Sequence, residues 1–150
     1  MIAKKYAMLI TLGACVLGLS VLGSTKNPVT RPLKSWGHAT VVISFMDGSF
    51  DATIVGHGTL TGASVSHGVG TVDPSIPAPV SGHGTVTAAN GDKLYWEVGP
   101  GGSTVITGGT GRFEGATGSL TETASDMVVT VEGATMTLNY TSVLDGTLTY

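Results

Sequence analysis

The sequence predicts an all-β fold: a single closed antiparallel β-barrel of about eight strands, preceded by an N-terminal signal segment. Apolar and polar residues alternate with period two in many segments between residues 36 and 150, and no segment keeps the apolar spacing of an amphipathic helix. The 23 glycines and an aromatic content of only 6% favour short strands joined by tight turns. A closed barrel is preferred to a sandwich because closure removes the sheet edges through which a Thr- and Val-rich chain would aggregate.

The N-terminus has the pattern of an export signal. Lys4 and Lys5 precede an uncharged run over residues 6–25, and we assign residues 1–23 to a signal peptide or a lipoprotein signal. Three fates are open: ordinary cleavage near the end of this segment, acylation of Cys15 in a lipobox-like Leu-Gly-Ala-Cys sequence, or an uncleaved anchor. Cys15 is the only cysteine, so the chain has no intramolecular disulfide.

Residues 24–35 follow with two prolines and three basic residues, and they are expected to form a linker to a barrel domain over residues 36–150. The clearest alternation covers residues 50–62, and its length predicts one long strand bent at Gly56 or Gly58. Proline-rich residues 73–79 are expected to form a loop, either a plain connection or a cover over one barrel mouth.

The other strands are placed by apolar residues that recur at every second position, with turn signals at residues 46–48, 90–92 and 132–133. These positions are expected to face the barrel interior. In chain order they are Val41, Ile43, Phe45, Leu94, Trp96, Val98, Met127, Val129, Val131, Met136, Leu138, Tyr140, Leu144 and Leu148.

Three Gly-His segments recur, around His38, His57 and His83. Histidine is a common metal ligand, so the repeated histidines suggest a metal site as one hypothesis. Each of these histidines, however, shares its strand face with threonines and lies opposite an apolar residue, which predicts that it points to solvent. We therefore expect no metal site and no cofactor.

Two polar residues are candidates for a catalytic role. His67 has the parity of the neighbouring Val65 and Val69, so it is expected to face the interior, either as a plain buried histidine or as one that contacts a ligand. Glu122 has the parity of Leu120. If it is buried, its pKa would be raised and it could act as an acid or base; the alternative is a strand end at which it reaches water.

A glycine-rich run covers residues 108–118, Gly-Gly-Thr-Gly-Arg-Phe-Glu-Gly-Ala-Thr-Gly. It predicts a turn and a strand bend in which Phe113 plugs the barrel, with Arg112 and Glu114 as an outward-facing ion pair. The run resembles the GGTGxF signature of the dirigent proteins and the GGSGxFEGxxG segment of the allene oxide cyclases. The chain is most similar to the bacterial secreted proteins of this allene oxide cyclase/dirigent-like β-barrel superfamily. The resemblance is confined to this run and the strand pattern, and the catalytic residues of the two plant families do not map onto it.

This resemblance implies a barrel whose cavity holds a small hydrophobic substrate, and in a cyclase or isomerase of this kind a few polar groups steer the reaction. The cavity-lining candidates for ligand binding are Trp96, Phe113 and Tyr140. A cavity above roughly 300 Å³ that contains His67 or Glu122 would favour the enzyme, and a core filled by side chains would favour a non-catalytic module.

Other function classes are excluded by the sequence. Clustered Lys and Arg are missing, which makes nucleic acid an unsuitable partner, and neither a dinucleotide fingerprint nor a phosphate loop is present. We expect an exported bacterial protein, periplasmic, envelope-associated or extracellular, with membrane contact only through a lipid or signal anchor and with oligomerisation left open. Its expected role is that of a non-catalytic binding or structural envelope module for a small apolar molecule, and the alternative is a cyclase or isomerase.

Overall fold

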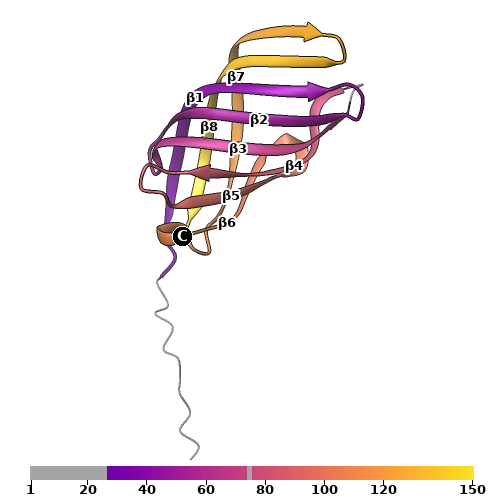
Figure 1. Ribbon diagram of the computed structural model, residues 1–150. Helices are drawn as coiled ribbons and strands as arrows, with labels where there is room; N and C mark the ends of the chain where they lie inside the picture. The colour runs from indigo at the N-terminus through magenta and orange to yellow at the C-terminus, as the bar shows by residue number, and fades with distance from the viewer. Residues whose placement is uncertain (1–26, 74–75) are drawn as a thin grey trace, which may run out of the picture.

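The computed structural model describes residues 27–73 and 76–150 and consists of a closed barrel of eight antiparallel strands, which confirms the predicted fold class (Figure 1). Each strand pairs with its neighbours in sequence, and β8 pairs with β1 to close the ring. The signal segment with Cys15 and the first part of the predicted linker lie outside the described residues. The strands are β1 (Thr30–Ser44), β2 (Ser49–Gly58), β3 (Gly62–Asp73), β4 (Ile76–Thr87), β5 (Lys93–Val98), β6 (Thr104–Gly109), β7 (Thr117–Glu132) and β8 (Thr135–Thr149).

The first strand begins at Thr30, before the expected start of the domain at residue 36. Pro32 lies within this strand, and Leu33 is buried in the core. The chain is ordered here because the whole of β1 pairs with β8, and Val29 and Tyr150 exchange two backbone hydrogen bonds just beyond the strand ends.

Two helical turns interrupt the strands, η1 (Pro100–Gly102) and η2 (Gly111–Phe113), both of the 3-10 type. In the part of the chain that the structure describes, no helix is long and apolar enough to cross a membrane.

The two ends of the barrel differ, and we call them the closed end and the open end. The closed end holds the first described residues, the C-terminus and the glycine-rich turn around Phe113 (Figure 1). The Phe113 side chain is fully buried and is confirmed as the plug. The Phe113 ring meets Tyr150 edge to face, at 5.5 Å between centroids. The buried apolar residues that surround it are Leu33, Ala88, Leu94, Ile106, Ala116, Leu120 and Leu148.

Arg112 covers this plug from outside, and its predicted ion pair with Glu114 is wrong. The guanidinium carbon lies 4.7 Å from the centre of the Phe113 ring, and Nη2 donates a hydrogen bond to the Leu60 carbonyl at 2.7 Å. Its ionic partner is Asp92, at 3.7 Å. The reason is that η2 turns the chain, so that Arg112 reaches across to the neighbouring turn that contains Asp92.

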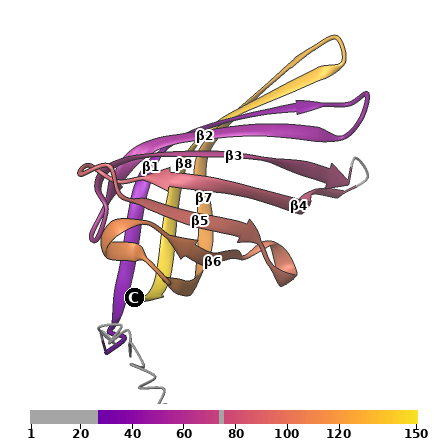
Figure 2. The ribbon, with the colours of Figure 1, turned by 60° about the horizontal axis from the view of Figure 1, so that its bottom comes forward.

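At the open end, the β7–β8 hairpin stands at the edge of the barrel, and β8 stays paired with β1 up to Ser44 and Thr135 (Figure 2). Three register pairs, between Thr104–Ile106 of β6 and Gly118–Leu120 of β7, close the ring. Among the described residues, the rest of β7 pairs with β8 alone. The expected inward positions Met127, Val129 and Val131 are all more than half exposed, because β6 does not extend alongside them. Met127 still lines the cavity, and Val129 and Val131 pair with Leu138 and Met136 and so lie on the same face of the hairpin as these two residues.

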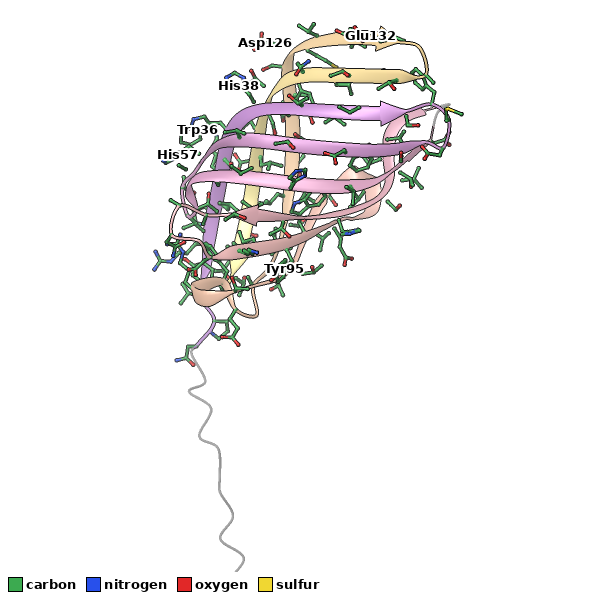
Figure 3. All side chains as sticks on the ribbon, in the orientation of Figure 1. Trp36, His38, His57, Tyr95, Asp126 and Glu132 are labelled. Atoms are coloured by element: carbon green, nitrogen blue, oxygen red, sulfur yellow. The ribbon has the colours of Figure 1, made fainter. Side chains whose placement is uncertain are left out.

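A bulge lies in this part of β7. The register of β7 against β8 shifts between Ser125 and Val128, and Asp126 adopts a positive φ of 53°. Figure 3 shows Asp126 and Glu132 on the β7–β8 hairpin.

Two predicted segments are also corrected. The strand expected over residues 50–62 ends at Gly58, and a turn separates it from β3, which starts at Gly62 with a positive φ of 64°. The loop expected over residues 73–79 is shorter, because β4 already starts at Ile76 and Pro79 pairs with Val72 at a bulge. Proline is tolerated there because the bulge interrupts the ladder of backbone hydrogen bonds.

Candidate functional site

The open end of the barrel encloses a cavity of about 250 Å³. Its walls are mostly apolar, and side chains from all eight strands contribute to them. Ile106 and Leu120 form its floor, because they belong both to the cavity lining and to the core around Phe113. The other lining residues used below are Ala52, Ile54, Ser66, Val86, Trp96, Glu122, Leu138 and Tyr140.

Glycines on the inner face of β3 and β4 accept a large side chain from β5 beside the cavity. Gly68 and Gly84 are register partners, and Gly84 in turn pairs with Trp96 of β5. A Cβ added at either glycine would overlap the indole ring of Trp96. The two glycines therefore make room for this ring inside the barrel, and its Nε1 donates a hydrogen bond to Ser66 Oγ at 3.1 Å.

Among the described residues, Glu122 is the one carboxylate in the cavity lining, and it lies on β7 two residues beyond the last pair with β6. Its Oε1 accepts hydrogen bonds from the Ser142 hydroxyl at 2.5 Å and from the Tyr140 hydroxyl at 3.2 Å. Ser142 and Tyr140 lie two residues apart on β8, so both side chains point to the same face of the sheet. Ser142 is buried, whereas water reaches Glu122 itself. Of the two predicted arrangements for Glu122, contact with water is correct, although the residue is not at a strand end.

Tyr140 is held in its neutral form by this environment. Burial raises the pKa of its phenol far above the ordinary value of about 10, and the adjacent Glu122 carboxylate raises that pKa further. The phenol is therefore a permanent hydrogen-bond donor at any physiological pH.

The predicted site residues separate into two groups. Trp96, Tyr140 and Glu122 meet in the cavity, whereas Phe113 lies below its floor and does not line it. The inward placement of His67 is wrong: its side chain is 64% exposed, and Nδ1 lies 3.8 Å from Asp51 on the outer face. Val65 and Val69 also face outward, because the inner face of β3 carries serines and glycines beneath Trp96.

The other three histidines point to solvent, as their parity predicts. His57 stacks on Trp36 with 5.4 Å between ring centroids, and both lie on the outer surface with His38 (Figure 3). In residues 27–73 and 76–150, no group of three His, Cys, Asp or Glu side chains has the arrangement of a metal site.

Two hydroxyl groups of the site were not singled out from the sequence, those of Ser66 and Ser142. The signal for Ser142 was present, because it shares its parity with Tyr140 and Leu144, both expected to face inward. No comparable signal existed for Ser66, since the valines of β3 indicated the opposite face.

Comparison with known proteins adds no assignment to this geometry: no protein-family model matches the chain, and neither does any curated protein.

Proposed function

We propose that this protein is an exported, non-catalytic barrel that binds a small apolar molecule in the cavity at its open end. We further propose that it is a bacterial secreted member of the superfamily that includes the allene oxide cyclases and dirigent proteins. The observation that carries the binding function is the apolar cavity of about 250 Å³, which occupies the place of a filled core. An apolar molecule gains roughly 25 cal/mol for each Å² of apolar surface that it removes from water.

A neutral apolar probe tests this function, with Trp96 as the reporter. The chain contains two tryptophans, and the Trp36→Phe variant removes the one on the outer face. Octanol titrated into this variant is expected to change the Trp96 emission with saturation. Calorimetry on the unmodified protein provides a second measurement.

A matched pair of variants locates the binding. Ala52 faces the cavity, and Val55, on the same strand, is exposed on the outer face. Ala52→Phe fills the cavity and is expected to abolish octanol binding, whereas Val55→Phe is expected to preserve it. Equal binding by the two folded variants, or no binding by the parent protein, would overturn the proposed function. Native mass spectrometry of protein from its own host would then identify the natural ligand.

A second candidate function is a cyclase or isomerase, and Glu122 is the observation that favours it. A carboxylate in a mostly apolar cavity, fixed by two hydroxyl donors, has the placement of a general base. The ligand recovered from the host distinguishes the two functions. An enzyme would convert it to an isomer of equal mass and changed retention time, and Glu122→Gln would abolish that conversion; a binding module would return it unchanged.

A further inference from the structure

We infer that the natural ligand is an amine, with a protonated nitrogen at Glu122 and a small apolar body in the cavity. This inference rests on the proposed binding function and names the ligand class of that site. The carrying observation is a carboxylate set among apolar and aromatic walls, with no cationic side chain in the lining.

The charge of the lining has one sign. Glu122 is its only carboxylate, and no Lys, Arg or His belongs to the described residues that surround the cavity. A ligand with a carboxylate head would meet the Glu122 carboxylate without any compensating cation in the described lining, and the two like charges would repel each other. A cationic head, by contrast, would pair with Glu122.

The hydrogen bonds that Glu122 accepts from protein side chains leave its Oε2 for the ammonium group of a ligand. Ser142 and Tyr140 both donate to Oε1, and none of the described residues donates to Oε2. An ammonium group carries only donors, and a charge-assisted hydrogen bond to a carboxylate is about twice as strong as a neutral one.

The aromatic residues of the cavity favour the same charge. The polar atoms of Trp96 and Tyr140 already donate to Ser66 and Glu122, which leaves the ring surfaces of both side chains for a ligand. Cations are attracted to the faces of tryptophan and tyrosine rings. A carboxylate head would gain nothing from these surfaces.

The position of Glu122 also sets the orientation of the ligand. Water reaches Glu122, while the floor of the cavity, at Ile106 and Leu120, is apolar and buried. The ammonium group would keep part of its hydration at the mouth, and the apolar body would extend toward the floor. Solvent screening at the mouth limits the gain from charge, so we expect a preference of about tenfold over a neutral head.

Three probes with the same apolar chain test the inference: octylamine, octanol and octanoate, titrated into the Trp36→Phe protein at about pH 7 and low salt, where the amine is protonated and the acid ionised. We expect octylamine to bind about tenfold more tightly than octanol, and octanoate to bind more weakly than both. Added salt is expected to weaken the binding of octylamine and to leave that of octanol unchanged.

Two charge-neutralising variants test whether Glu122 causes the preference for octylamine over octanol. Glu122→Gln is expected to bring octylamine down to the affinity of octanol. Glu97→Gln removes the same charge from the outer face, one residue from Trp96, and is expected to keep the preference. This pair separates contact at the site from general attraction to an acidic protein.

The outcomes are distinct. Octanoate binding as tightly as octylamine, or a preference that survives in Glu122→Gln, would overturn the amine inference while leaving the proposed binding function in place. Failure of all three probes to bind would overturn the proposed function itself. If Glu122→Gln does not fold, the ranking of the three probes and its salt dependence still decide the inference.

Discussion

The closed end and the open end of this barrel are made by the same eight strands, yet only one of them is filled. At the closed end, Phe113 and its apolar neighbours are buried, and Val29 and Tyr150 exchange two backbone hydrogen bonds. At the open end, the interior is hollow, and among the described residues the end of β7 pairs with β8 alone (Figure 2). The two halves of one small domain therefore differ in packing: one holds a buried core and the other a cavity, where we propose that the ligand binds.

The largest effect is expected at the closed end. Phe113→Ala removes a fully buried ring from a packed core and should lower the free energy of unfolding by about 3–5 kcal/mol. Leu138→Ala, at the cavity wall, should cost less than about 2 kcal/mol, because a side chain next to a void has fewer packing contacts to lose. Urea denaturation of both variants measures the difference. Equal losses would show that the open end is packed as tightly as the closed end.

A smaller effect is expected where the cavity wall is tightest. Gly84→Ala places a methyl group against both the His67 carbonyl oxygen and the Trp96 ring, and it should lower the free energy of unfolding by about 1–3 kcal/mol. The matched control is Gly108→Ala, where an added Cβ meets only the Tyr95 ring, at an ordinary 3.6 Å. The control should change stability by less than about 1 kcal/mol. Thermal unfolding compares the stability of the two variants. A Gly84→Ala protein as stable as the control would contradict the packing of the Trp96 ring against Gly84.

The smallest effect is a pH dependence at Tyr140. Its pKa is raised in the folded state, so the unfolded chain loses the phenolic proton first as pH rises. The resulting contribution to stability is complete below about pH 10, the ordinary tyrosine value, and declines as pH rises above it. Tyr140→Phe should therefore lose less stability than the parent protein between pH 9 and about pH 11. Tyr95→Phe, on the outer face, serves as control, and identical pH profiles for the parent and Tyr140→Phe would refute the assignment.

The same contrast explains what could be predicted from the sequence. On β2, Phe50 and Ile54 face inward as their parity indicated, since a packed interior takes the larger apolar side chains. On β3 the rule failed, because the space beneath Trp96 is filled from β5 and only Ser and Gly fit the inner face. The two apolar residues Val65 and Val69 were therefore predicted to face inward, and His67, which shares their parity, was wrongly predicted to face inward as well.

Glu122 was found by parity because β7 keeps one apolar residue, Leu120, directly before it on the same face. Its partner Ser142 was missed although it shares its parity with Tyr140 and Leu144, because a serine itself gives no hydrophobic signal. The exposure of Met127 and Val129 follows from the shortness of β6, which pairs with β7 only up to Leu120, and this feature is not visible in the local pattern of β7. Residues that line a cavity are therefore harder to place than those that fill a core.

The central claim, one barrel with a hollow end and a filled end, is tested most directly by diffraction from crystals held under xenon, a gas that occupies dry apolar cavities. We predict xenon density in the open end, among Ile54, Val86 and Leu138, and none around Phe113. An open end with no xenon, closed by inward-packed side chains, would contradict the account.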